Sequence, residues 1–393
     1  MTDMEHLLGK FQSTNLEGRL KTSKYYKWIA DVQARIHRRI PDNHYNTSRV
    51  PRATDYREEI FEGKNCGRAV IYLLSNGCEW SLKGASGCTM CGHLARQTRQ
   101  ESMLSPDDHV FQFQTEFARV DFKQYPLLNV FNNGSFLNDN EIAPAARRRI
   151  LQQINADPHI RMVVLESRPE FVSEDKIAEI RELVPDKHVE IALGLELKND
   201  LYRSTCLNKG FSLKQYDTAA DLVCGALHLR TYVFLKPPFL IEQESIDEAV
   251  DTVEHAFRRG STTVSLEACT IQDYTLVRCL YDTGQFKPPW LWSILEVVKR
   301  CFRPDRKLVV GMFRFFPSPE VVPFNCDQCS RAVMQALAHY NRTLDIAAFD
   351  SLSCACRRQW QTQLTEPAPP LAERIEIALS RLEPHLRFLE PRK

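Results

Sequence analysis

The chain has 393 residues, of which 43% are hydrophobic, 10% aromatic and 26% charged, proportions that are ordinary for a folded protein. This composition excludes a chain that is mainly disordered, collagen-like or coiled-coil, and the length suffices for two or three domains. Lys and Arg number 51 against 50 Asp and Glu, so the net charge of +1 excludes a global attraction to nucleic acid or membrane.

Residues 1–65 form the first predicted domain, a leader that is locally basic and aromatic. Bases between residues 19 and 52 far outnumber acids, and Tyr25, Tyr26, Trp28 and Tyr45 lie among them. Bases beside aromatic rings suit an RNA backbone and exposed bases, while the alternative is a helix whose rings pack on the rest of the protein. The start has no apolar core followed by a cleavage site, so we expect a cytoplasmic protein with no membrane partner.

Residues 66–312 form the second predicted domain, in which seven short apolar runs alternate with longer amphipathic stretches. The runs begin at Arg68, Tyr125, Arg161, Val189, Leu229, Thr262 and Lys307, and helical patterns cover 142–154, 173–183 and 245–258. Near-continuous apolar strands between helices are typical of parallel βα units buried on both faces. We therefore predict an α/β barrel or doubly wound sheet, with function at the carboxyl ends of its strands.

Three cysteines follow the first run in a C-x9-C-x2-C array, namely Cys78, Cys88 and Cys91. Cysteines in a chain without a secretion signal favour metal or cluster ligation over disulfides. Three ligands favour a four-iron cluster with one iron open to another molecule. A structural zinc site would need a fourth ligand, such as His93 or Cys66.

The segment GCTMCGH at residues 87–93 resembles the radical SAM superfamily, and within it the branch of the elongator catalytic subunit and the archaeosine-biosynthesis radical SAM proteins. Similar segments are FNNGSFLND from Phe131, LESRPEFV from Leu165, the stretch from Gly194 and YDTGQFKPPWLWS from Tyr281. The x9-x2 spacing differs from the commoner x3-x2 pattern. The resemblance implies a partial (βα)6 barrel whose three cysteines hold a 4Fe-4S cluster, with S-adenosyl-L-methionine chelated by the open iron.

The resemblance also implies which residues contact S-adenosyl-L-methionine. The NNGS segment would hold the ammonium group of the cofactor, and Glu166 and Glu196 would bind its ribose. Arg168 or Lys209 would bind its carboxylate, and Met90 occupies the position of an adenine contact. The assigned residues are Met90, Asn133, Gly134, Ser135, Glu166, Arg168, Glu196 and Lys209. From the residues alone, ordinary turns and structural ion pairs remain the alternative. No catalytic residue is assigned, and Glu267, Asp273, Tyr274 and Trp290 are left without a role.

Residues 313–393 form the third predicted domain, a small arm with a second set of cysteines. Cys326, Cys329, Cys354 and Cys356 make a C-x2-C-x24-C-x-C pattern. Four thiolates in two close pairs favour a closed tetrahedral zinc site that replaces a hydrophobic core, and a second iron-sulfur cluster is the alternative.

The resemblance implies reductive cleavage of S-adenosyl-L-methionine to a 5′-deoxyadenosyl radical that acts on a modified tRNA base. In the archaeosine branch the base is a lysine adduct of a 7-deazaguanine, and a C–N bond is cleaved. Expected partners are tRNA, a reductase such as flavodoxin or ferredoxin, and a lysine-transferring protein. Two alternatives stay open: a radical enzyme on a small metabolite or peptide with an auxiliary cluster, and a non-catalytic zinc-stapled RNA-binding protein.

Overall fold

The computed structural model describes residues 24–40, 53–75, 77–82, 87–96, 104–313 and 318–388. Several residues of the predicted basic leader, namely Arg19, Lys21, Tyr45, Arg49 and Arg52, lie outside the described residues. None of the described helices is long and apolar enough to cross a membrane.

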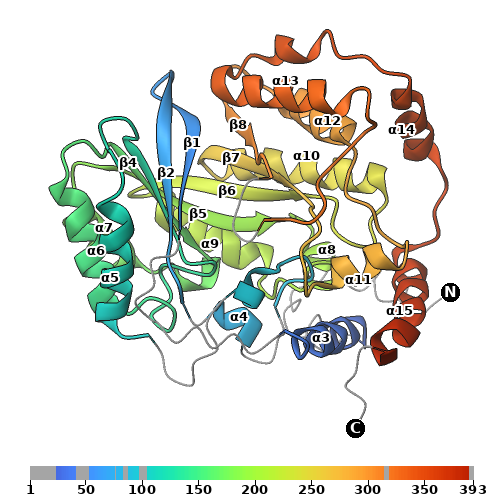
Figure 1. Cartoon of the computed structure of the whole chain (residues 1–393), viewed down its shortest axis with the longest axis horizontal. Coiled ribbons are helices and arrows are strands. Elements are labelled where there is room, and N and C mark those ends of the chain that lie inside the picture. The colour runs from blue at the N-terminus through green and yellow to red at the C-terminus, as the bar shows by residue number, and fades with distance from the viewer. Residues whose placement is uncertain are drawn as a thin grey trace.

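One sheet of eight strands, ordered β1 to β8 along the chain, forms the centre of the molecule (Figure 1). The strands are β1 (Ala53–Phe61), β2 (Lys64–Tyr72), β3 (Leu127–Phe131), β4 (Met162–Ser167), β5 (His188–Glu196), β6 (His228–Leu235), β7 (Ser261–Ala268) and β8 (Lys307–Val310). Strands β2 to β8 are parallel to their neighbours, while β1 pairs antiparallel with β2. The parallel α/β architecture predicted from the seven apolar runs is confirmed, and so is the partial barrel that the family resemblance implied.

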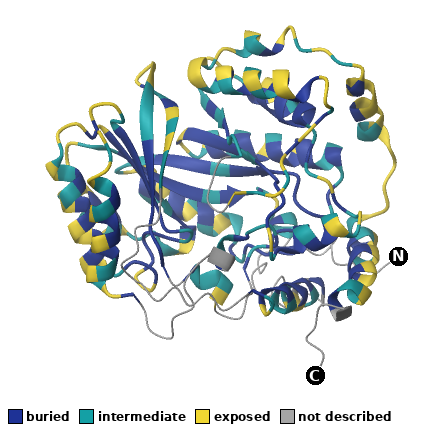
Figure 2. Ribbon diagram, in the orientation of Figure 1, coloured by how far each residue is buried: buried dark blue, intermediate teal, exposed yellow. Residues whose placement is uncertain are grey.

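Longer helices connect the parallel strands and cover the outer face of the sheet (Figures 1 and 2), namely α5 (Pro106–Phe117), α6 (Pro144–Ala156), α7 (Glu174–Leu183), α9 (Leu213–Cys224), α10 (Glu242–Arg258) and α12 (Leu291–Cys301). The short helices α4 (Glu79–Leu82), α8 (Asp200–Thr205) and α11 (Leu276–Asp282) lie in the connections after β2, β5 and β7, and the 3-10 turns η1 (His93–Arg96) and η2 (Pro169–Phe171) lie in those after β2 and β4. Outward residues of the strands, such as Ile71, Val130 and Leu165, are fully buried against the longer helices. Burial of this apolar surface supplies the main stabilisation of the fold.

The other face of the sheet is polar and encloses a cavity of about 1200 Å³. Strand residues that line it include Arg68, Tyr72, Asn129, Phe131, Glu166, Ala192, Gly194, Arg230, Tyr232, Phe234, Ser265, Glu267 and Val309. Because side chains alternate along a strand, the same seven strands supply an apolar outer face and a polar inner one.

Strand β1 lies within the predicted leader and was not expected from the sequence. Its sequence ATDYREEIF carries charges where an apolar run would be, because Arg57 and Glu59 line the polar cavity. Glu59 forms ion pairs with Arg68 of β2, Arg230 of β6 and Lys307 of β8, the last at 2.6 Å. The hairpin of β1 and β2 is therefore joined by charge to the opposite edge of the half-barrel.

The described part of the leader before β1 contains helix α3 (Lys24–His37), which packs against the C-terminal helix α15 (Leu371–Phe388). Tyr25 is buried and its hydroxyl donates to Glu376 at 2.6 Å. Arg35 forms an ion pair with Glu383 at 2.9 Å. These contacts correspond to the alternative in which the aromatic side chains of the leader pack on the rest of the protein. They also engage one basic residue of the leader, Arg35, in an ion pair.

The arm after β8 contains α13 (Ser330–Thr343), η3 (Ile346–Phe349) and α14 (Cys356–Thr365) before α15. Helix α13 packs on α12 and β8 and contacts β1, so the arm lies across the gap between the first and last strands (Figure 1). Arg331, Met334 and Asn341 of α13 line the cavity. The arm is thus part of the cavity wall.

Candidate functional site

The predicted cysteine loop lies at the carboxyl end of β2, where Cys78, Met90 and the other two cysteines, Cys88 and Cys91, line the cavity. Burial raises the pKa of the Cys78 and Cys91 thiols to about 12, and it also raises the pKa of Cys88. Because burial disfavours free thiolates here, a bound metal is what would hold these sulfurs ionised.

The spacing of these thiols distinguishes between the two metal centres considered from the sequence. Among the described residues, the four arm cysteines are the group whose ligand atoms all lie within 4.8 Å of one another. The three loop cysteines do not form such a group, whereas two thiolates on one tetrahedral zinc lie about 3.8 Å apart. The donor set therefore fits a cluster of several irons better than a single zinc.

The cysteine loop is held by the loop that follows β5. Thr89 donates through its backbone N to Leu207 O at 3.1 Å and through its hydroxyl to Cys206 O at 2.7 Å. The indole of Trp80 donates to Asn208 O at 2.6 Å, and the Asn208 amide donates to Gly87 O at 2.7 Å. These four bonds fix the position of the cysteines relative to the carboxyl end of β5.

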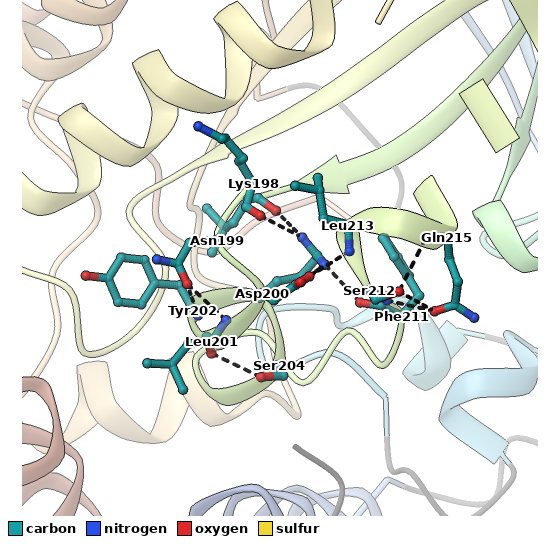
Figure 3. Close-up of polar contacts among 12 residues, drawn as sticks. Lys198, Asn199, Asp200, Leu201, Tyr202, Ser204, Phe211, Ser212, Leu213 and Gln215 are labelled. Atoms are coloured by element: carbon teal, nitrogen blue, oxygen red, sulfur yellow. Dashed lines mark hydrogen bonds and ion pairs between the residues drawn. The ribbon is translucent and has the colours of Figure 1, made fainter. Parts of the chain in front are cut away.

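The loop after β5 is itself ordered by capping interactions, which Figure 3 shows. The Asn199 side chain accepts from the backbone N of Leu201 and Tyr202 at 2.9 and 3.2 Å and begins α8. The Asp200 carboxylate accepts from Leu213 N at 2.6 Å, and Ser212 begins α9. Both ends of the segment that carries Asn208 and Lys209 are thereby fixed.

Glu196 and Lys209, both predicted to contact the cofactor, form a buried ion pair of 2.7 Å that lines the cavity. A bulge at the end of β5 and a left-handed backbone at Glu196, with φ of 64°, turn its carboxylate toward Lys209. Gly194 leaves the necessary space, since a Cβ there would lie 2.6 Å from the carboxylate. Burial disfavours the Lys209 ammonium, but Glu196 outweighs it and raises the Lys209 pKa.

Arg168 lies beside this pair with its guanidinium already partnered. It donates to Glu170 at 2.6 Å and to Lys209 O at 2.7 Å, and it stacks on Trp80 with 4.9 Å to the ring centroid. Its backbone N donates to the Ser135 hydroxyl at 3.1 Å. Arg168 therefore connects the cysteine loop with the loops after β3, β4 and β5.

Asn133 and Gly134 line the cavity after β3, whereas Ser135 is buried beneath them. Asn133 has a left-handed backbone with φ of 55°. The turn is held by Glu141, whose carboxylate accepts from Ser135 N at 2.6 Å and from Glu79 N at 3.0 Å. Sequence reasoning missed Glu141 because no motif marks an acid that serves backbone donors of two separate loops.

Glu166 lines the same cavity as the Glu196–Lys209 pair but forms no ion pair with Lys209. It accepts a hydrogen bond from the Tyr232 hydroxyl, and burial together with nearby Glu267 raises its pKa to about 7. Glu267 lines the same cavity, as do Asn129 and Arg57, none of which received a role from the sequence. These residues lie on different strands, so the sequence alone did not indicate that they line one cavity.

The three other residues that the sequence left without a role do not line this cavity as described. Asp273 forms an ion pair with Arg278 at 3.0 Å. The indole of Trp290 donates to Gln363 at 2.7 Å, and Tyr274 packs beside the cluster around Ile271.

The four arm cysteines converge as predicted. Sulfur–sulfur distances are 3.5 Å for Cys326–Cys329 and Cys326–Cys354, and 3.6 Å for Cys329–Cys356. Trp292 donates its indole N–H to Cys356 Sγ at 3.3 Å. The group has the donor set and convergence of a closed site for one metal ion.

Comparison with known proteins supports the resemblance seen in the motifs. The chain is 29% identical over 315 residues to archaeosine synthase subunit beta of Methanosarcina acetivorans, covering 80% of this chain and 90% of that protein. It is 29% identical over 314 residues to the protein of the same name from Thermococcus kodakarensis, covering 77% and 94%. No protein-family model matches the chain. These relatives confirm the similarity to the archaeosine branch that the motifs indicated.

Solved structures are more distant. Methylornithine synthase aligns with a TM-score of 0.46 and 14% identity over 95% of this chain and 99% of that one. An elongator protein of Methanocaldococcus infernus aligns with a TM-score of 0.44 and 15% identity over 60% and 58%.

Proposed function

We propose that this protein is a radical SAM enzyme that acts on a modified base of tRNA. The observation that carries the proposal is a set of three half-buried cysteines that line a polar cavity. Their sulfurs do not gather closely enough to share a single metal ion, and a network joining four loops holds them. The relatives named archaeosine synthase subunit beta support the same assignment over most of the chain.

In this proposal Cys78, Cys88 and Cys91 hold a 4Fe-4S cluster, and the cavity beside them receives S-adenosyl-L-methionine. The bound cluster and S-adenosyl-L-methionine supply a 5′-deoxyadenosyl radical when one electron is delivered. Lys209 offers a cation and Glu196 a carboxylate for polar groups of the cofactor. Asn133 and Gly134 offer the turn after β3, Met90 an apolar contact, and Arg168 positions the surrounding loops.

For the substrate we propose a lysine adduct of a 7-deazaguanine base in tRNA, from which a C–N bond is cleaved. The relatives' name supports this class of reaction. The cavity of about 1200 Å³ has room for a small-molecule cofactor and an extruded base with its adduct. The proposal implies a lysine-transferring partner protein and a reductase such as flavodoxin or ferredoxin.

The test is anaerobic purification, reconstitution with iron and sulfide, and reduction by dithionite with S-adenosyl-L-methionine. We expect about four loop-bound irons per chain and formation of 5′-deoxyadenosine. Cys88→Ala should abolish formation, while the exposed Cys224→Ser serves as the matched control. Deoxyadenosine formed by Cys88→Ala, or none formed by the reconstituted wild type, would overturn the proposal and favour a non-catalytic RNA-binding protein.

For the arm we propose a structural zinc ion on Cys326, Cys329, Cys354 and Cys356. Sulfurs 3.5–3.6 Å apart match ligands of one tetrahedral metal, for which about 3.8 Å is expected. A four-iron cluster would distribute the four thiolates over separate irons and hold them farther apart. Metal analysis separates the two: one zinc supports the proposal, and four additional irons in the arm would instead support the auxiliary cluster of a different radical enzyme.

A further inference from the structure

Two carboxylates of the cavity wall that are at least half-buried, Glu166 of β4 and Glu267 of β7, have no ion-pair partner among the described residues. Glu59 and Glu196, which also line it, are both ion-paired. Glu166 and Glu267 form no ion pair with any residue that the structure describes. Their hydrogen-bond donors are neutral hydroxyls, that of Tyr232 for Glu166 and that of Ser265 for Glu267 at 2.6 Å.

The two carboxylates belong to one site, because both line the same cavity and Glu267, after burial, raises the pKa of Glu166. Burial also raises the pKa of Glu267, and Glu196 adds to that effect. Gly311 of the chain just after β8 lies against Glu267, and a Cβ there would collide with its carboxylate. The glycine therefore keeps the space that the Glu267 side chain occupies beside the cavity.

A buried amide adds an independent acceptor to this site. Asn129 lines the cavity and is only 1% exposed, yet its Oδ1 accepts no hydrogen bond. It pairs in register with Val164 of β4, and Glu166 lies two residues farther along the same face of that strand. A buried acceptor without a donor is destabilising, so a ligand donor is the expected partner.

Arg57 supplies a contrasting charge to both carboxylates. Its guanidinium donates to Asp55 at 2.8 Å through Nε and to the Tyr72 hydroxyl at 2.8 Å through Nη2. No described residue accepts from its Nη1, and its charge acts on both Glu166 and Glu267. A guanidinium with a remaining donor that faces a cavity is suited to a carboxylate.

From this arrangement we infer that the cavity binds the head group of an α-amino acid, with Glu166, Glu267 and Asn129 accepting from its ammonium and Arg57 donating to its carboxylate. An ammonium offers three N–H donors for these three acceptors. No third described carboxylate or imidazole lies close enough to make this a metal site. The inference rests on the proposed function in that the head group is taken to be the free end of the substrate's amino-acid part.

The test is calorimetric titration of the purified full chain with L-norleucine, which carries one ammonium and one carboxylate. N-acetyl-L-norleucine lacks the ammonium and L-norleucine amide lacks the carboxylate. We expect each change to weaken binding at least tenfold. Glu267→Gln should weaken L-norleucine binding about tenfold, while Glu182→Gln, at an exposed position of α7, should leave it unchanged.

The inference would be overturned if the wild-type protein bound none of the three probes at millimolar concentration, or bound all three equally. It would also be overturned if Glu267→Gln protein bound L-norleucine as the wild type does. The ligand series does not depend on the folding of any variant. Deoxyadenosine formation is measured separately. Turnover without discrimination among the probes refutes this inference alone, and discrimination without turnover refutes the proposed function alone.

Discussion

Glu141 shows how one buried side chain can organise a site that it does not line. Besides its bonds to Ser135 N and Glu79 N, it accepts from the amides of Asn132 and Asn138 at 3.1 and 3.0 Å, and it is only 3% exposed. Glu79 follows Cys78 directly, so the carboxylate joins the cysteine loop to the turn after β3.

We therefore predict that Glu141→Gln destabilises the site although it preserves the shape of the side chain. One oxygen becomes an amide donor that faces other donors, at a loss of about 2 kcal/mol of unfolding free energy. The reconstituted variant should retain less iron than the wild type, as measured by iron analysis after gel filtration. Glu182→Gln on the surface of α7 is the control. Equal iron content in both variants would contradict this role of Glu141.

The raised pKa of Glu166 predicts how binding of an amino acid should depend on pH. Burial first, and then Glu267, hold this carboxyl protonated below about pH 7, against the opposite effect of Tyr232, Arg57 and Lys209. Only the ionised form attracts an ammonium, so L-norleucine affinity should rise about tenfold from pH 6 to pH 8. Titration calorimetry at several pH values measures this. Glu166→Gln should flatten the profile, and a wild-type affinity independent of pH would refute the prediction.

At the scale of elements, the sequence predicted those helices, strands and cysteine groups whose pattern lies within a short segment of the chain. Strands β2 to β8 were predictable because their buried outer faces and helical connections repeat along the chain. The two cysteine groups were predictable because close spacing brings their ligands together. Strand β1 was not predictable from the sequence, because its inward positions Arg57 and Glu59 are charged. A single segment does not indicate that the interior it faces is polar.

The cavity residues were missed for a related reason. Asn129, Tyr232 and Glu267 lie on three separate strands, and only the register of the sheet makes them neighbours of one space. The leader was ambiguous because an amphipathic basic helix has the same sequence whether it contacts RNA or α15. In the structure Tyr25 and Arg35 face the acids of α15.

The arm gives a prediction at the same scale. Cys326 and Cys329 precede α13, and Cys354 and Cys356 precede or begin α14, so one metal ion would join both helices to the barrel. Its removal by a chelator should open residues 318–365 to proteolysis, because thiols alone do not hold the two segments together. Limited proteolysis with mass spectrometry reads this out, and Cys329→Ser should reproduce it. Cleavage confined to the barrel, or an arm that stays resistant without metal, would contradict a structural role.

On the scale of the whole molecule, the half-barrel is joined across its open side by buried charge. Glu59 of β1 pairs with Arg68, Arg230 and Lys307, and Arg230 also pairs with Glu190 of β5 at 2.6 Å. Burial alone would raise the carboxyl pKa values, but Arg230 and the other cations outweigh it, lowering that of Glu59 strongly and that of Glu190 to about 2. This network connects strands that the backbone hydrogen bonds of the sheet leave unpaired.

The sign of these shifts predicts the response of the fold to acid. A carboxyl whose folded pKa lies below its unfolded value of about 4.5 stabilises the protein above that pH, and the contribution is lost as pH falls toward the folded pKa. The urea concentration at which half of the protein is unfolded should therefore decrease as the pH is lowered from 5 to 3. Glu59→Gln leaves three cations around a neutral amide and should remove about 3 to 5 kcal/mol at pH 7. The variant should also lose less stability between pH 5 and pH 3 than the wild type or Glu182→Gln, because the group that titrates is gone. Parallel acid profiles for Glu59→Gln and the wild type would show that this network does not hold the two edges of the half-barrel together.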